Sequence, residues 1–428
     1  MASISEQDTS LHVAVIGAGI VGISTAIWLQ RMGQRVTIID REGPATGASF
    51  GNGGVLASCA VVPVTVPGLM ARAPRMLLDR RQPLFLRWSY LPRLMPWLLR
   101  YLSHANVADV KRTADALYGL IGNALADHQA LAAGTGAERY VVPSDYTYLY
   151  AGRKDYDGDA FGWSVRHSLG FRWDELEGPA ARKLDPLIGP HIGFAARMGD
   201  HGRISDPERY VITLAEHLIS RGGRLLQGEV TDFEREGDAV TGLRVKDKAG
   251  HEDLLTCDAV VLATGAWSGP LAARLGLRVP LESERGYHID LWAPSQQLRA
   301  PVMVAAGKFV ATPMEGRIRL AGIVEYGGLD APAREAPLDL LRFHVRRAFP
   351  ELRWRNESTW MGHRPMTVDS LPLIGPVPGL AGAYAALGHQ HIGLTGGART
   401  GQLLAQIISG QHVNLPLHPF DPGRFGRP

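Results

Sequence analysis

Residues 11–40, LHVAVIGAGIVGISTAIWLQRMGQRVTIID, decide the fold of this chain. The segment opens with an apolar run typical of a buried parallel strand, passes through GAGIVG into a helical pattern, and ends with a second strand that closes on Asp40. The order of a strand, the glycine motif, a helix, a second strand and an acidic residue is the one that a dinucleotide-binding βαβ unit requires. A lone glycine motif is weak evidence, and its alternative is a glycine turn without a ligand. The complete order favours the binding site.

Each residue of the motif has a separate role in such a unit. Gly17 makes the tight turn, Gly19 lets the backbone approach a pyrophosphate, and Gly22 lets helix and strand pack closely. The helix that begins at Ile20 turns free N–H groups and the positive end of its dipole toward the anion. Asp40 is placed to accept hydrogen bonds from a ribose diol. The unit alone does not separate NAD from FAD.

Composition excludes several classes of protein. The 428 residues suffice for two or three packing units, and 45 Lys and Arg against 42 Asp and Glu argue against a dedicated nucleic-acid binder. Two cysteines, Cys59 and Cys257, exclude a disulfide framework and a cysteine-rich metal site. No metal is expected. The polar residues 1–10 lack the pattern of a signal peptide, and no long uncharged apolar run suggests a spanning helix, so a cytoplasmic location is expected.

Three later glycine-rich segments favour FAD over NAD. GASFGNGG at 47–54 is poor enough in side chains to lie against a flat ring system and to offer backbone N–H donors. TGAW at 264–267 ends a later apolar strand. GLTG at 393–396 starts the last helix, whose N-terminus would stabilise negative charge on a reduced flavin.

The remaining pattern predicts a second, inserted domain. Strands over 287–292, 308–312 and 317–321 suit a mostly antiparallel sheet. The expected fold is therefore α/β plus α+β, a Rossmann-like FAD-binding domain with an inserted substrate domain. The expected boundaries are residues 1–82, 196–275 and 358–428 for the FAD-binding domain, and 83–195 and 276–357 for the substrate-binding domain. Further predictions are a helical pattern over 63–136, a capping box at 205–208 and a single strand over 225–230.

Several longer motifs add a family resemblance. Beside GAGIVG and GASFGNGG, they are ERGYHI at 284–289, GKFVATPME at 307–315, WMGHRPMTVDSLPLIG at 360–375 and GHQHIGLTGGARTG at 388–401. With these motifs the chain resembles, over nearly its whole length, the FAD-dependent D-amino-acid dehydrogenases of the wider D-amino-acid oxidase and glycine oxidase family. Within that family it looks most similar to glyphosate-oxidising bacterial members.

This resemblance implies a glutathione-reductase-like FAD domain and oxidation of a C–N bond, with hydride passing from the α-carbon to flavin N5 and hydrolysis of the imine. It implies that the arginine of Gly-x-Arg-Pro, here Arg364, grips the substrate carboxylate, and that the Val230 position contacts adenine. FAD is expected to be bound non-covalently. Besides the βαβ residues, the expected FAD contacts are Arg41, Ala48, Ser49, Asn52, Gly53, Gly54, Val230, Thr264, Gly265, Gly388, Ile392, Gly393, Leu394 and Thr395.

Four side chains are candidates for the substrate site. Arg364 presents a planar fork that matches a carboxylate; its alternative is a structural pair with Asp369. Tyr287 is a second donor to that carboxylate, or else a core tyrosine. Arg285 is a ligand for a second acidic group, or a surface charge, which is favoured. His389 accepts the amine proton or lines the pocket, or else is a hydrogen-bonded structural histidine.

The substrate and the electron acceptor stay open at this point. D-amino acids compete with secondary amines such as glycine derivatives, and a non-catalytic flavin-bound subunit is the contrasting hypothesis. The resemblance implies a quinone acceptor at the inner face of the bacterial inner membrane, with oxygen as the alternative. Aromatic and arginine side chains over 83–102 suit an interfacial segment. The alternative is a helix packed onto the substrate domain.

Overall fold

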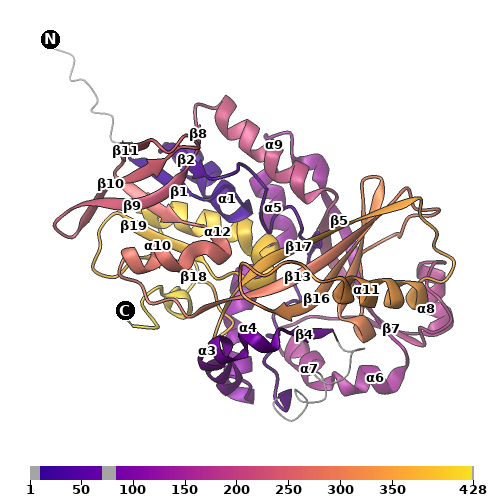
Figure 1. Ribbon diagram of the computed structural model, residues 1–428. Coiled ribbons are helices and arrows are strands. Elements are labelled where there is room, and N and C mark those ends of the chain that lie inside the picture. Colours follow the sequence, from indigo (N-terminus) through magenta and orange to yellow (C-terminus); the bar gives the residue numbers. More distant parts are fainter. Residues whose placement is uncertain (1–9, 70–82, 427–428) are drawn as a thin grey trace.

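The computed structural model describes residues 10–69 and 83–426. A six-stranded sheet in the order β18-β19-β12-β1-β2-β8 forms one half of the molecule and is parallel apart from the β18–β19 pair (Figure 1). Its strands are β1 (His12–Ile16), β2 (Arg35–Asp40), β8 (Arg224–Gln227), β12 (Ala259–Leu262), β18 (Leu373–Pro376) and β19 (Ala383–Leu387).

Strand β1 shows why this sheet is buried on both faces. Val13 and Val15 belong to one apolar cluster, with residues of α1 (Ile20–Arg31), α9 (Pro207–Ser220) and α12 (Gly393–Ile408). Ala14 and Ile16 belong to another, with the meander β9–β11 and α10. The bounds of these elements are β9 (Glu229–Glu236), β10 (Ala239–Lys246), β11 (Glu252–Thr256) and α10 (Ser268–Arg274). Burial of each valine or isoleucine stabilises the fold by about 1.5–3 kcal/mol.

The second half of the molecule is built on a ten-stranded sheet. Its main path runs β17-β13-β16-β15-β14-β5-β7-β3, while β4 pairs with β16 and β6 with β7. All pairs are antiparallel except β14–β5 and β16–β4, as the 287–292, 308–312 and 317–321 strands predicted. The strands are β3 (Val55–Leu56), β4 (Leu84–Leu86), β5 (Val141–Tyr150), β6 (Asp174–Glu177), β7 (Phe194–Ile204), β13 (Leu281–Trp292), β14 (Val302–Val304), β15 (Phe309–Met314), β16 (Arg317–Tyr326) and β17 (Asn356–Thr367).

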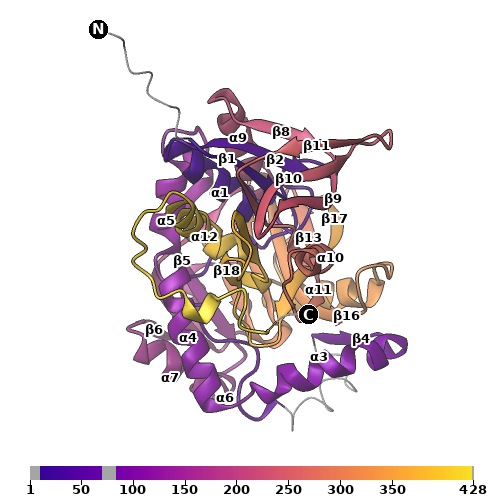
Figure 2. The same cartoon turned by 90° about the vertical axis from the view of Figure 1, so that its left-hand side faces the viewer.

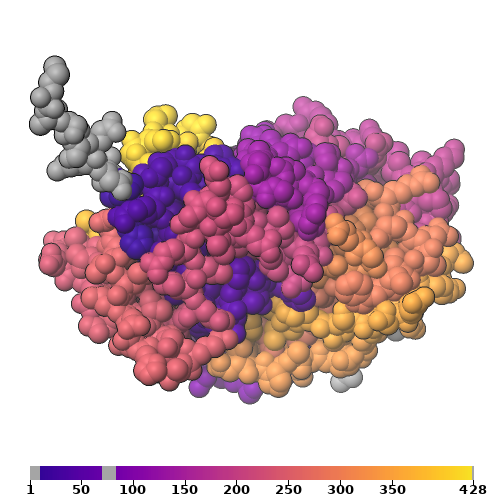
Figure 3. Space-filling view, turned by 90° about the horizontal axis from the view of Figure 1, so that it is seen from above, coloured from indigo at the N-terminus to yellow at the C-terminus, as the bar shows by residue number. Residues whose placement is uncertain are grey.

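Helices cover this sheet and join the two halves (Figure 2). They are α3 (Leu91–Ser103), α4 (Val107–Ile121), α5 (Ala124–Ala132), α6 (Arg153–Gly158), α7 (Ala160–Ser168), α8 (Gly178–Leu184) and α11 (Glu335–Ala348). Seen from above, segments from the start, the middle and the last third of the chain lie side by side on one surface (Figure 3). No helix within 10–69 or 83–426 is long and apolar enough to cross a membrane.

Strand pairing and helix packing differ from the expected domain boundaries at β3, β7, β17, α4 and α5, and β3 pairs with β7 although it was expected in the FAD-binding domain. Strand β17 begins at Asn356, before the expected boundary at 358, and it pairs with β13 along its whole length. Strand β7 pairs with β5, although most of it was expected in the FAD-binding domain. Helices α4 and α5, expected in the substrate domain, contribute to the apolar cluster around α1 and α12. Long-range strand pairing and helix packing are not visible in local periodicity.

Some local predictions also needed correction. Residues 43–54 lack regular structure, as predicted. The strand expected over 225–230 is broken at Gly228, where a Cβ would lie 2.6 Å from a methyl of Val245. The cap of α9 is Asp206, whose carboxylate accepts from the Arg209 N–H at 3.1 Å. The helical pattern over 63–136 contains strand β4, and its residues 70–82 lie outside the described residues.

Candidate active site

One cavity of about 1190 Å³ lies between the two halves and is lined from both. Its volume exceeds the roughly 300–1,000 Å³ of ordinary small-molecule sites, so it suits a large ligand together with a small one. All the expected FAD contacts line it except Gly22 and Gly54. Within 10–69 and 83–426, no cluster of His, Cys, Asp and Glu could hold a metal ion.

The glycine motif forms a turn in which Gly17 and Gly22 leave no room for a side chain. Gly17 has φ +109°, and a Cβ there would lie 2.5 Å from the Ala263 carbonyl oxygen. A Cβ on Gly22 would lie 1.9 Å from the Gly17 oxygen. The first amide of α1 is already bonded, because Ile20 N–H donates to Ser49 Oγ at 2.9 Å. Ser49 therefore shares the helix N-terminus with any bound anion.

Asp40 closes this turn from the end of β2. Its carboxylate accepts from Ala18 N–H at 2.8 Å and from Glu42 and Gly43 N–H, both at 2.9 Å. A carboxylate offers about four acceptor positions, so it keeps capacity toward a ribose. Nearby, the Arg41 guanidinium lies 5.3 Å from the centre of the Trp267 ring.

The loop 47–54 is fixed from the ten-stranded sheet through its carbonyl groups. Arg319 donates to the carbonyls of Phe50 at 2.6 Å and Asn52 at 3.1 Å. Thr312 Oγ1 donates to the Gly53 carbonyl at 2.6 Å, and His288 Nδ1 lies 3.1 Å from that of Gly51. With these carbonyl groups bonded to the sheet, the loop is a preformed wall of the cavity.

The anchor of this loop is a buried ion pair that the sequence analysis missed. The buried Arg319 donates to both oxygens of the buried Asp290, at 2.8 Å each. His288 is buried beside them, and burial, reinforced by the charge of Arg319, lowers its pKa to about 4. The available signal was the alternation of β13 and β16, which places charged residues opposite each other across two inward-facing strands.

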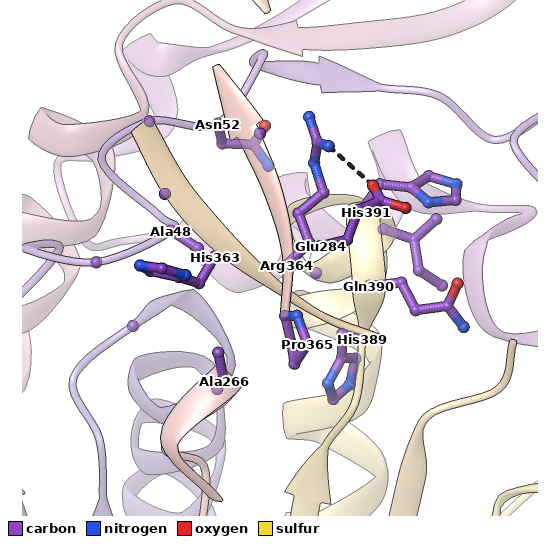
Figure 4. Close-up of a pocket in the computed structure, with 18 of the residues that line it drawn as sticks. Ala48, Asn52, Ala266, Glu284, His363, Arg364, Pro365, His389, Gln390 and His391 are labelled. Atoms are coloured by element: carbon purple, nitrogen blue, oxygen red, sulfur yellow. Dashed lines mark hydrogen bonds and ion pairs between the residues drawn. The ribbon is translucent and has the colours of Figure 1, made fainter. Parts of the chain in front are cut away.

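Arg364 lies in the cavity as predicted, but its partner differs from the expected one (Figure 4). Its Nη1 donates to Glu284 Oε1 at 2.8 Å and to the Ile323 carbonyl at 3.1 Å. Its side chain occupies the space that a side chain at Gly286 would fill, 2.4 Å from a Cβ there. The alternative pair with Asp369 is wrong, because Arg424 takes both oxygens of Asp369.

Tyr287, which lines the cavity, and Arg285 both bond to a single carboxylate, that of Glu325. The Tyr287 hydroxyl donates to Glu325 Oε2 at 2.5 Å, and burial with this bond raises its pKa to about 12. Arg285 lies 3.1 Å from the same Glu325 oxygen, and both side chains are 0% exposed. The favoured surface placement of Arg285 is therefore wrong, and the hydroxyl expected on a substrate carboxylate has a protein partner.

Two histidines precede α12, and both line the cavity, but only His391 is exposed. His389 is buried, its Nε2 lies 3.0 Å from Thr400 Oγ1, and burial lowers its pKa to about 4. His391 is exposed to the cavity (Figure 4). Its pKa is also lowered, chiefly because the protein surrounds it, while Glu284 opposes the shift and Arg364 adds to it. His391 was not among the predicted site residues, although the motif at 388–401 contains both histidines.

Comparison with known proteins gives these features a family. The sequence profile of the FAD dependent oxidoreductases, DAO, matches residues 12–407. The chain belongs to this family. It is 38% identical to a D-amino-acid oxidase of Bradyrhizobium diazoefficiens, over 97% of this chain and 99% of the relative. It is 29% identical to a D-amino acid dehydrogenase of Methylobacterium nodulans, again over 97% and 99%.

Solved structures support the fold. Glycine oxidase from Geobacillus kaustophilus superposes with a TM-score of 0.71 at 22% identity, over 97% of this chain and 99% of the other. Iminodiacetate oxidase from Chelativorans gives 0.68 at 22% identity, over 96% and 98%. At such identities the likeness shows the fold alone.

The cavity fits FAD on the evidence of its walls. A pyrophosphate needs the side-chain-free approach that Gly17 and Gly19 provide, and a flat ring needs the preformed loop that Arg319 anchors. Asp40 would hold the adenosine ribose, and the start of α12 at Gly393 would face the flavin. The non-covalent state of the cofactor stays a prediction.

Proposed function

We propose that this enzyme oxidises the C–N bond of an amino acid or an N-substituted glycine, with the carboxylate of the substrate held at Arg364. The observation that carries the proposal is a guanidinium inside the cavity whose Nη1 alone is paired with a carboxylate. Its Nη2 makes only a 3.4 Å contact with the Gly322 carbonyl, which leaves one edge for a ligand. The chemistry that FAD would supply when bound is hydride acceptance, here from the carbon next to the nitrogen.

The chain itself supplies orientation and a proton acceptor. Glu284 and the Ile323 carbonyl fix the Arg364 fork, and a fixed fork places the α-carbon of a bound carboxylate reproducibly. His391 faces the cavity with a lowered pKa, so at neutral pH its imidazole is free to accept a proton from the substrate nitrogen. His389, the residue expected for this task, is buried and bonded to Thr400 and is better suited to shaping the loop.

The acceptor and the membrane remain part of the proposal. The inner side of α3 is packed, with Leu94, Trp97 and Tyr101 buried, while Trp88 and Leu99 are each 61% exposed beside exposed arginines. This outer surface has the composition of an interfacial segment. We propose that it contacts anionic lipid while a quinone takes the electrons.

Two measurements test the acceptor and the lipid contact. The rate of oxygen uptake by the reduced enzyme in detergent-free buffer is compared with the rate of its reoxidation by a soluble quinone, and equal rates would contradict the quinone assignment. Failure to sediment with vesicles containing phosphatidylglycerol would contradict the lipid contact.

The experiment that tests the function is anaerobic reduction of the holoenzyme by a panel of compounds. The panel holds D- and L-amino acids, sarcosine, iminodiacetate and glyphosate, and the measurement is bleaching of the flavin band. Arg364→Met should lower the ratio of the flavin-reduction rate constant to the substrate Kd by roughly 100-fold or more, because a charge-assisted bidentate contact is lost. Arg424→Met, which breaks an ion pair outside the cavity, is the matched control. No bleaching by any compound, with FAD bound, would overturn the proposal.

A further inference from the structure

The cavity continues well beyond Arg364 along the face of the ten-stranded sheet. In the strand register Ala321 lies opposite Val310, Val310 opposite Met303, and Met303 opposite Tyr148. Directly opposed residues project from the same face of a sheet. All four line the cavity, so this row is the floor of an arm that runs from β16 to β5.

A guanidinium closes this arm. Arg166, from α7, lies 5.3 Å from the ring centre of Tyr148 and 5.0 Å from that of Trp163, and it lines the cavity. Its Nε donates to the Cys59 carbonyl at 3.0 Å, and its Nη2 to Tyr148 Oη at 3.4 Å. Arg166 is partly buried, and no carboxylate of the described residues lies within ion-pair distance of it.

The other charged groups of the arm do not neutralise this guanidinium. Lys308 and Asp159 face each other at 3.9 Å, and their side chains are 59% and 41% exposed. The remaining neighbour is the Cys59 thiol, hydrogen-bonded toward Tyr148 at 3.9 Å. Burial raises the pKa of that thiol, but its interaction with His201 and the charge of Arg166 outweigh burial and lower it. The arm is therefore positive overall unless the thiol is ionised.

We propose that Arg166, with the hydroxyl groups of Tyr146 and Tyr148, forms a second anion-binding subsite for a distal carboxylate or similar oxyanion of the substrate. The inference rests on the proposed function, because it takes the α-carboxylate to lie at Arg364. The Arg364 guanidinium lies over β16, three strand positions from β5, and neighbouring strands are about 4.8 Å apart. The backbone gap is thus roughly 14 Å, which side chains from both ends shorten, so the distal group belongs on a side chain longer than that of aspartate.

The test compares acidic substrates with neutral ones of matched length. The values of kcat/KM are measured for D-aspartate, D-glutamate and D-2-aminoadipate against D-asparagine, D-glutamine and D-norleucine. Wild type should prefer the acid, and the preference should grow with chain length. Arg166→Met should lower kcat/KM for D-2-aminoadipate about 10- to 100-fold, as expected for loss of a charged hydrogen bond, and leave D-norleucine within about threefold. Arg166→Lys should retain part of the preference.

Two further measurements keep the outcomes distinct. Cys59→Ala should keep the acid preference; if it abolishes the preference, the guanidinium serves the thiol and the proposal falls. Glutarate and sulfate, which cannot be oxidised, are titrated against the flavin spectrum of wild type and Arg166→Met. Glutarate binding that needs Arg166, in an enzyme that oxidises no amino acid, would overturn the proposed function but support the subsite. Sulfate binding at Arg166 without any acid preference would overturn the substrate assignment, and equal loss for acidic and neutral substrates would overturn the subsite.

Discussion

The cofactor side and the substrate side of this cavity are built in different ways. On the cofactor side the decisive residues, Gly17, Gly22, Asp40 and Ser49, are close in sequence, and all of them form or bond one backbone turn. On the substrate side Arg364 meets Glu284, 80 positions away, through side chains on paired strands. A site made of backbone turns is fixed by a short motif, whereas a site made of cross-strand pairs is fixed only by the register of the sheet.

The largest expected effect breaks the backbone-built side. In Gly22→Val the added side chain would overlap the Gly17 carbonyl, since even its Cβ would lie 1.9 Å from that oxygen. The turn has no flexible neighbour that could move aside, so we expect purified protein without stoichiometric FAD, or no folded protein. Flavin content per chain is the measurement. Gly158→Ala, at the end of α6, outside the cavity and with nothing within 4 Å, is the control and should bind FAD normally. Full FAD content in Gly22→Val would show that the turn can accommodate a side chain at this position and would contradict the prediction.

A smaller effect separates the two arginines of the substrate side. Arg285→Met removes the charge that faces Glu325, in a pair that is 0% exposed on both sides. Loss of one partner of a buried pair costs about 3–5 kcal/mol in free energy of unfolding, and Arg87, 3.2 Å from the other Glu325 oxygen, should reduce this cost. Urea unfolding measures it. The folded fraction should keep its flavin-reduction rate, in contrast to Arg364→Met. A stable Arg285→Met enzyme that no longer reduces flavin would place Arg285 in the substrate site.

Acidification tests the burial of three histidine side chains. His128, His288 and His389 have pKa values lowered from 6.5 to about 4, in each case chiefly by burial. Below pH 6.5 the unfolded chain takes up protons that the folded protein does not, so stability falls as the pH drops from 6.5 toward 4. Each histidine should cost about 2 kcal/mol at pH 5.

His128 is the best probe of this effect because it lies outside the cavity and bonds Tyr210 and the Leu394 carbonyl. His128→Gln should be less stable at pH 7.5 but should lose less stability than wild type between pH 7.5 and 5. The midpoint of thermal unfolding across that range is the measurement. Exposed His412→Gln is the control and should follow wild type. An unchanged pH slope in His128→Gln would show that this histidine is protonated in the folded state.

The same contrast explains which features could be predicted from the sequence and which could not. The βαβ unit and the 43–54 loop without regular structure followed from local motifs with one physical requirement each, whereas Arg364, which lines the cavity, was indicated by the family resemblance. The partner of Arg364 and the orientation of Arg285 did not. Arg285 lies directly opposite Glu325 in the β13–β16 register, and a bulge separates this pair from the pair of Tyr287 with Gly322. Such a bulge depends on two strands about 40 residues apart, and alternation within one strand does not reveal it.

The smallest expected effect sharpens the comparison at Tyr287. Tyr287→Phe removes the hydroxyl that donates to Glu325 and accepts from the Arg334 N–H at 3.1 Å. Because Arg285 and Arg87 still face Glu325, we expect a loss of only about 1–2 kcal/mol in free energy of unfolding. The KM for the substrate should change less than about twofold, since the hydroxyl has a protein partner. A tenfold rise in KM without loss of stability would mean that the hydroxyl turns to the substrate carboxylate when ligands bind. The geometry of the substrate side would then depend on the bound ligand as well as on the strand register.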